Sequence, residues 1–96
     1  MEEDKMDHSI SIRPECLRPA ASGWVKPTGP EIREIIQRAG FTQSEAARLL
    51  GVAVQPSGGA RQIRKWIAEE HHIPYPAWAL LCHAAGLGEI WINEPD

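Results

Sequence analysis

The sequence predicts an all-α fold of four to five short helices, in which two central helices are joined by an enlarged turn. Three observations lead to this prediction. Two stretches open with the Thr-x-x-Glu signal that starts helices, at Thr28 and Thr42. Apolar residues then recur three and four positions apart, which is the spacing of one helix face. Glycines and prolines separate these stretches, as they do at helix ends.

Length and composition bound the size of the core. The chain has 96 residues, 43% of them hydrophobic and four of them Trp, which suits one small domain that dimerisation would stabilise. Cys16 and Cys82 are too few for a disulfide framework and fit a reducing cytosol, so we expect a cytoplasmic protein. The sequence contains neither a run long enough to span a membrane nor the pattern of a signal peptide.

The net charge of −3 counts against a nucleic-acid binder, but the charges are unevenly placed. Acids gather near both ends, whereas residues 46–68 contain bases and no acid. The bases of this segment are Arg48, Arg61, Arg64 and Lys65. Salt screens charges beyond about 8–10 Å, so the acidic ends leave room for a local basic face.

Residues 1–27 are expected to form a flexible N-terminal arm, because they open with the charged run MEEDKMDHS. Residues 9–13 alternate polar and apolar side chains, which predicts a short edge strand. Trp24 is expected to fold back onto the domain, and an arm that reaches DNA or a partner is the alternative. The prolines expected to break any regular element here are Pro14, Pro19 and Pro27.

The domain is expected at residues 28–92, followed by a tail at 93–96. Its first helix should begin at Thr28, which caps it while Glu31 bonds back, and should end at Gly40. The predicted apolar stripe is Ile32, Ile35, Ile36 and Ala39. The side chains expected to face solvent are Arg33, Glu34, Gln37 and Arg38.

The second helix is expected from Thr42 to Leu50, with Thr42 and Glu45 forming a second capping box. Gly51 should end it in the left-handed region. The residues expected to face inward are Ala46, Ala47, Leu49 and Leu50. The following loop at 53–59 contains a proline and two glycines, so it cannot be helical as a whole.

The third helix should begin within residues 57–60 and run to about Ala68. Ile63, Trp66 and Ile67 fall at the spacing of a buried stripe, and Trp66 is read as a core residue. The side chains that this stripe leaves facing outward are Arg61, Gln62, Arg64 and Lys65. These side chains are the types that read DNA, since Arg suits guanine and phosphate, Gln suits adenine, and Lys suits phosphate.

The fourth helix should begin around Pro76. It is apolar around much of its circumference, which predicts either a buried helix or a dimer surface. Trp91 follows in an apolar tail that could cover the core or a partner subunit. The residues we expect in a dimer interface are Trp78, Leu81 and Trp91.

The segments GFTQSEAARLLGV and RQIRKW resemble the helix-turn-helix of the Cro and phage-repressor superfamily, the XRE-type regulators with a lambda-repressor-like fold. The segment IPYPAWALLCHAAGL resembles the next helix of small phage and mobile-element regulators, including anti-CRISPR-associated repressors. The resemblance covers about residues 28–87, and its first half is fairly specific. The chain departs from the pattern in the turn, which is several residues longer than usual.

The resemblance implies a transcriptional regulator, most simply a repressor that binds an inverted repeat of double-stranded DNA as a homodimer. Thr42 and Gln43 would meet a phosphate at the start of the second helix, where unpaired N–H groups favour an anion. Ser57 would add a phosphate contact at the start of the third helix. The side chains that would contact base edges and phosphates are Arg61, Gln62, Arg64 and Lys65.

Other functions find less support in the residues. His71, His72, Cys82 and His83 give no four-ligand spacing for a metal, and helix neighbours such as Cys82 and His83 do not face each other as a catalytic pair must. The loop at 53–59 lacks the lysine of a phosphate-binding loop. We therefore expect no enzyme, cofactor or small-molecule ligand. The acidic net charge keeps one alternative open, a protein-interaction module such as an antitoxin-like or adaptor domain.

Overall fold

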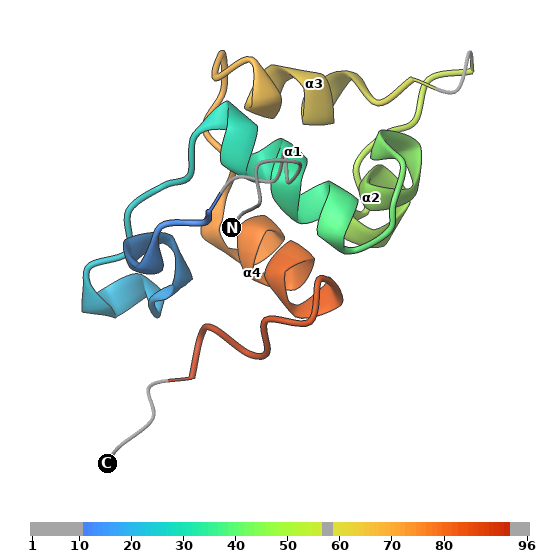
Figure 1. Ribbon diagram of the computed structural model, residues 1–96. Coiled ribbons are helices and arrows are strands. Elements are labelled where there is room, and N and C mark those ends of the chain that lie inside the picture. The colour runs from blue at the N-terminus through green and yellow to red at the C-terminus, as the bar shows by residue number, and fades with distance from the viewer. Residues whose placement is uncertain (1–10, 57–58, 93–96) are drawn as a thin grey trace, which may run out of the picture.

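The computed structural model describes residues 11–56 and 59–92, and it is helical with no strand among them. Four α-helices follow one another: α1 (Gly29–Arg38), α2 (Gln43–Leu50), α3 (Arg61–Ile67) and α4 (Tyr75–Ala84). In Figure 1, α1 lies at the centre with α3 above it, α4 below it and α2 to one side. Both α1 and α2 pack against α3 and α4. The prediction of a small all-α helix-turn-helix fold is confirmed.

Both predicted capping boxes are present. The Thr28 hydroxyl accepts from the Glu31 backbone N–H, and the Glu31 carboxylate accepts from the Thr28 N–H at 2.7 Å. The Thr42 hydroxyl accepts from the Glu45 N–H at 3.1 Å, and the Glu45 carboxylate accepts from the Thr42 N–H at 2.8 Å. Each box satisfies two N–H groups that a helix start leaves unpaired. The local sequence therefore fixes where α1 and α2 begin.

A single core lies between the four helices. Its fully buried large side chains include Trp78, Ile32, Ile35, Ile63 and Leu81. Two expectations about facing are wrong. Leu49, expected inward, is 40% exposed, because the buried stripe of α2 runs through Ala46 and Ala47 and leaves Leu49 beside it. Glu34, expected in solvent, is only 7% exposed, and its carboxylate accepts a hydrogen bond from Arg38 Nε at 2.6 Å.

The segment before α1 contains two 3₁₀-helices, Pro14–Leu17 and Ala20–Ser22. The expected edge strand is absent from residues 11–13, and its first two residues lie outside the described part of the chain. The expectation that prolines would break every regular element here is also wrong. Proline supplies a helical φ and lacks only an N–H that the first turn leaves unpaired, so Pro14 starts a 3₁₀-helix.

Cys16 fixes this segment to α4. Its side chain is fully buried, and its carbonyl accepts hydrogen bonds from Trp24 Nε1 at 3.0 Å and Trp78 Nε1 at 2.7 Å. The Tyr75 hydroxyl donates to the Arg18 carbonyl at 3.0 Å. Trp24 also meets Tyr75 edge to face, with ring centroids 5.0 Å apart. The prediction that Trp24 folds back onto the domain is therefore confirmed. Residues 16–24, predicted to belong to a flexible arm, pack against α4.

Glu31 joins the same segment to α1. Its carboxylate accepts from Arg13 Nε at 3.0 Å, Arg13 Nη2 at 2.9 Å and the Arg13 backbone N–H at 3.0 Å, besides the Thr28 N–H. Burial alone would raise the pKa of Glu31, but the hydrogen bonds from Arg13 and Thr28 outweigh it and lower the pKa to about 2. The capping box of α1 thus also anchors the residues that precede it.

Candidate nucleic-acid interface

Helix α3 is anchored in the core by two side chains, and its two arginines face solvent. Ile63 is fully buried and Trp66 nearly so, which confirms the reading of Trp66 as a core residue. Arg61 and Arg64 are exposed, and Gln62 and Lys65 are half-buried. A shallow hollow on the outer side of α3 is lined by Arg61, Arg64, Lys65, Ala68 and Glu70. The four predicted side chains therefore come from one short helix that the core holds in place.

The enlarged turn between α2 and α3 has two ends with different roles. Gly51 ends α2 with φ +74°, and Val52 and Val54 then pack against the core. Farther along, the Gln55 N–H donates to the Gly59 carbonyl at 2.7 Å. A Cβ on Gly59 would lie 2.9 Å from Arg64 Nη1. The end of the turn therefore lies directly under the Arg64 guanidinium. Ser57, predicted to contact phosphate, is outside the described residues.

The end of α3 is held by the start of α1. Glu69 adopts a left-handed backbone with φ +63°, and its carboxylate accepts from the Gly29 N–H at 2.8 Å. A Cβ on Gly29 would lie 1.9 Å from the Ile67 carbonyl oxygen, so only glycine allows this approach. After this reversal, His71 Nδ1 lies 3.2 Å from Gln62 Nε2. Sequence reasoning missed these contacts, because Gly29 and Glu69 are forty positions apart.

Two curated relatives are similar to this chain over most of its length, and both are described as transcriptional repressor protein KorC of Escherichia coli. One is 52% identical over 85 residues, which cover 88% of this chain and 95% of the relative. The other is 49% identical over 86 residues, which cover 90% of this chain and 96% of the relative. The chain belongs to the KorC family of transcriptional repressors. No family model and no solved structure matches it.

The KorC relationship confirms the prediction of a transcriptional repressor at the level of the family. The matched region covers nearly nine tenths of this chain. It is therefore longer than the part that resembles XRE-type regulators, about residues 28–87. Since no family model matches, the XRE resemblance stays a prediction.

At the start of α2 of this KorC-family chain, the predicted capping box engages Thr42, where a phosphate contact is also predicted. Both the hydroxyl and the backbone N–H of Thr42 are engaged with Glu45 in the capping box. Gln43 is half-buried beside them. An acid at this position already complements the positive end of the helix, so Glu45 competes with a phosphate for it.

Helix α4 does not present the side chains predicted for a dimer surface. Trp78 and Leu81 are both fully buried within this chain, where they form part of the core, so neither can contact a second subunit. Trp91 differs, because its side chain is 43% exposed. The expectation for Trp78 and Leu81 is wrong for a physical reason: on a helix that is apolar almost all round, sequence spacing does not reveal which side faces the core.

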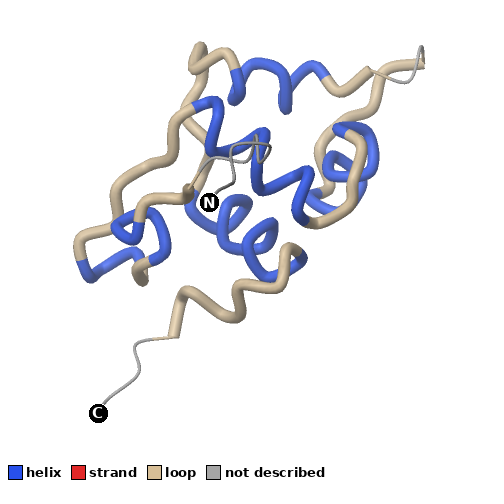
Figure 2. The backbone as a smooth tube through the Cα atoms, viewed as in Figure 1, coloured by secondary structure: helices blue, strands red, loops and turns tan. Residues whose placement is uncertain are grey.

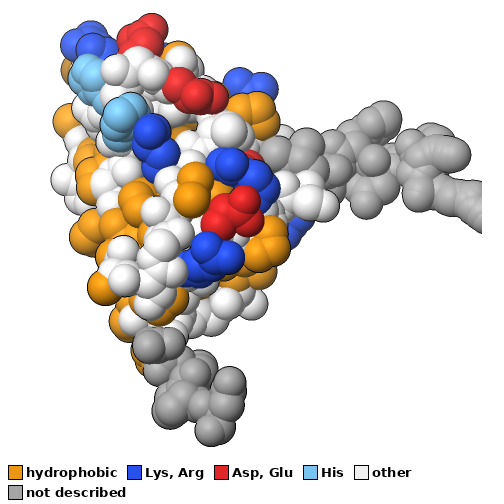
Figure 3. All heavy atoms as spheres, turned by 90° about the vertical axis from the view of Figure 1, so that its left-hand side faces the viewer, with side chains coloured by type: hydrophobic (Ala, Val, Ile, Leu, Met, Phe, Trp, Pro, Cys, Tyr) orange, Lys and Arg blue, Asp and Glu red, His pale blue; other side chains and the backbone are white. Residues whose placement is uncertain are grey.

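A different apolar surface lies beside α3. One hollow is lined by Leu50, Val52, Trp66, Pro74, Pro76, Ala77 and Leu80. A neighbouring hollow is lined by Tyr75, Pro76, Ala79, Leu80 and Trp91. The two share Pro76 and Leu80 and contain no charged side chain, and we call them together the apolar surface. Figure 3 shows hydrophobic side chains gathered along one edge of the face it presents, apart from most of the charged ones.

The described residues hold no cluster of three or more His, Cys, Asp or Glu side chains that could bind a metal ion. Both thiols are buried, and burial raises the pKa of Cys16 to about 11 and that of Cys82 to about 12. Neither is therefore a thiolate nucleophile at neutral pH. No described helix is long and apolar enough to cross a membrane.

Proposed function

We propose that this KorC-family chain binds double-stranded DNA at specific sequences and represses transcription by occupying a promoter. Helix α3 enters the major groove. The observation that carries the proposal is the outer face of α3, where Arg61 and Arg64 are exposed while Ile63 and Trp66 fix the helix from inside. A rigidly anchored helix with outward cations and an amide supplies both orientation and base contacts.

The four outward side chains make different contacts with DNA according to their chemistry. Arg61 stands at the first position of α3 and Arg64 lies one turn later, so both can reach guanine edges or phosphates on one side of the helix. Lys65 supplies a point charge for the phosphate backbone, and Gln62 reads a base edge. These contacts release counterions, so the affinity should fall steeply with salt.

A second contact region lies at the start of α2. Thr42 and Gln43 are proposed to meet a phosphate there, as the resemblance implies. Because Thr42 is engaged with Glu45, Gln43 is the better-placed donor. Ser57 is proposed as a further phosphate contact in the enlarged turn. These contacts would position α3 and carry no sequence information of their own.

The repressor is proposed to act as a homodimer on an inverted repeat. One short helix reads few base pairs, and two copies related by a two-fold axis would read half-sites about 34 Å apart. The apolar surface is the proposed contact between them. Trp66 of α3 lines one of its hollows, so pairing through it would place each α3 helix next to the contact between the two subunits. An uncharged surface also avoids repulsion between two chains of net charge −3.

The test is a fluorescence-anisotropy titration of DNA duplexes from the region upstream of the gene. Arg61→Ala and Arg64→Ala should each weaken binding about tenfold, because each removes a charge-assisted contact. Arg18→Ala is the matched control, since Arg18 is exposed on the segment that packs beside α4. Equal affinity of all three variants and the wild type would contradict the proposal. It would favour the second candidate, a protein-interaction module, which the net charge of −3 supports.

A further inference from the structure

The chain reverses direction at the end of α3 and returns along it. Ala68 closes the helix, and Glu69 turns the chain through the left-handed region at φ +63°. The N–H groups of Glu70 and His71 then donate to the Lys65 carbonyl at 2.9 and 3.3 Å. The reversal brings His71 back beside Gln62, in the first turn of the helix that the chain has just left.

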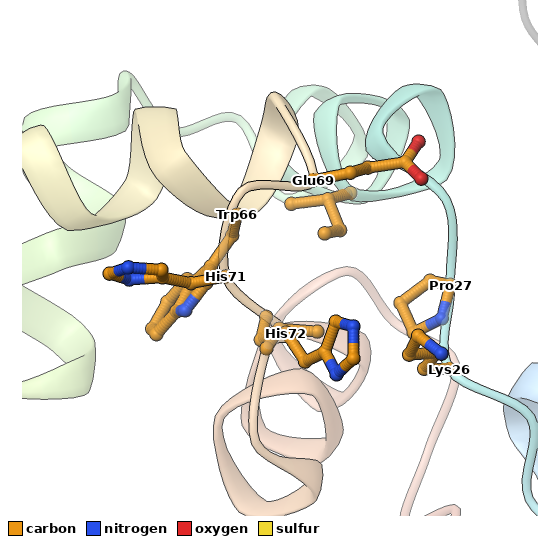
Figure 4. A pocket seen from close by; sticks show the side chains of 8 residues that line it. Lys26, Pro27, Trp66, Glu69, His71 and His72 are labelled. Carbon is orange, nitrogen blue, oxygen red and sulfur yellow. The ribbon is translucent and has the colours of Figure 1, made fainter.

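This reversal is fixed from outside α3. The Glu69 carboxylate accepts from the Gly29 N–H at 2.8 Å, and the Gly29 backbone presses against the Ile67 carbonyl. A left-handed backbone at a residue with a side chain is strained, so it persists only where the surroundings hold it. Figure 4 shows Glu69 reaching toward the chain that begins α1. The position of His71 is thus set by the start of α1 as well as by α3.

His71 and its neighbour His72 point in different directions. Figure 4 shows the His72 ring directed toward Lys26, while the His71 ring points away from it. His71 Nδ1 instead lies 3.2 Å from Gln62 Nε2. An amide nitrogen can only donate, so Nδ1 accepts in this contact, which is the role it has in the tautomer that carries its proton on Nε2. One N–H of the Gln62 amide is therefore occupied within the protein.

We infer that His71 is a positioning residue that sets the orientation of the Gln62 amide for base reading. With its nitrogen turned to His71, Gln62 keeps its carbonyl oxygen and one N–H for a ligand. That pair matches an adenine edge, which offers N6–H as a donor and N7 as an acceptor. An amide turned the other way would instead present its N–H groups alone, which suit guanine. His71 therefore favours adenine over guanine at one position of the operator.

This inference rests on the proposed function, because it concerns how the same helix reads DNA. It adds a residue outside α3 to the reading face, and it assigns a base to one side chain. A shift of the reversal would move His71 away from Gln62 and release the amide.

The experiment uses the full-length chain and a DNA duplex that the wild type selects from a random pool. Competition anisotropy then measures affinity for that duplex and for duplexes changed at one base pair each. We expect Gln62→Ala and His71→Ala to lose discrimination at the same adenine, by about three- to tenfold, as the loss of one hydrogen bond predicts. Discrimination at the other positions should be retained.

Three further variants separate positioning from other effects. Gln62→Ala/His71→Ala should discriminate no worse than Gln62→Ala, because the two side chains act through one contact. His71→Asn, whose carbonyl can accept the same N–H, should restore part of the discrimination. His72→Ala is the matched control and should behave as the wild type, since His72 is also exposed but its ring points toward Lys26.

Two results would overturn the inference. One is a His71→Ala variant that discriminates at every position as the wild type does. The other is a His71→Ala variant that loses affinity equally for all duplexes, which would indicate a general contact rather than positioning. Failure of the proposed function is a separate result, because the wild type would then select no sequence, or Arg61→Ala and Arg64→Ala would bind as the wild type does.

Discussion

Replacing Glu31 with glutamine should destabilise the fold by about 3 kcal/mol. The pKa of this carboxyl falls from an ordinary value of 4.5 to about 2, and each pKa unit corresponds to about 1.36 kcal/mol. Glu31 is only 3% exposed, so solvent screens its contacts little. The loss is a large share of the roughly 5–15 kcal/mol that holds a domain of this kind together. Thermal unfolding should shift by roughly 10–25 °C.

The matched control is Glu45→Gln. Glu45 occupies the same position in the capping box of α2, but it is exposed and hydrogen-bonds to Thr42. Glutamine also serves at this place in a capping box, so the control should lose only about 0.5 kcal/mol or less. Urea unfolding followed by circular dichroism gives both free energies. The difference between the two variants measures what burial and Arg13 add to the cap.

The pH dependence gives an independent check with a definite sign. The pKa of Glu31 is lowered by folding, so its stabilising contribution is complete above about pH 4.5 and disappears as the pH falls toward 2. The gap in unfolding free energy between wild type and Glu31→Gln should therefore close over that window. A gap that is absent at pH 7, or that stays constant down to pH 2, would refute this account of the Arg13 and Glu31 contact.

Three further changes test other contacts. Gly29→Ala places a Cβ 1.9 Å from a backbone carbonyl of α3, so it should destabilise the fold by about 1–3 kcal/mol in urea unfolding; a neutral result would contradict the close approach. Gly59→Ala should displace only the flexible end of the Arg64 side chain. The affinity for DNA, measured by anisotropy, should fall severalfold while the melting temperature stays unchanged. An unchanged affinity would show that the turn does not influence DNA binding. Leu80→Glu should shift sedimentation equilibrium toward monomer, whereas Leu49→Glu, equally exposed but outside the apolar surface, should not; equal behaviour of the two variants would exclude that surface.

Local signals predicted the fold well. Two capping boxes and the stripe of Ile63 and Trp66 depend on residues three or four positions apart, so the sequence displays them directly. The left-handed end of α2 at Gly51 is equally local, since glycine is the residue that adopts it without strain. These features place the helices and show which face of α3 is outward.

Contacts between distant segments were not predictable in the same way. Arg13 meets Glu31 across eighteen positions and Gly29 meets Glu69 across forty, and neither pairing leaves a periodic trace. The same limit applies to Trp78, whose indole N–H finds its partner sixty-two positions away. An apolar helix can be buried by its own chain or by a partner. For α4, packing against α1, α2 and the N-terminal segment decides between them.

The sequence did not predict the residues that contact and position the outward side chains of α3. The outward side chains of α3 follow from helical spacing, but His71 reaches Gln62 only because the chain reverses at Glu69. A glutamate in the left-handed region is uncommon, so propensity alone argues against such a turn. The enlarged turn likewise contributes through Gly59, which leaves space for the Arg64 guanidinium.

The most direct test of the central claim is the salt dependence of DNA affinity. The logarithm of the association constant should fall linearly with the logarithm of the salt concentration, by about 0.9 for each phosphate contact. If Arg61 and Arg64 both meet phosphates, the double variant Arg61→Ala/Arg64→Ala should have a slope that is shallower by about two, and Arg18→Ala should keep the wild-type slope. A double variant with the wild-type slope and affinity would show that α3 does not lie against DNA.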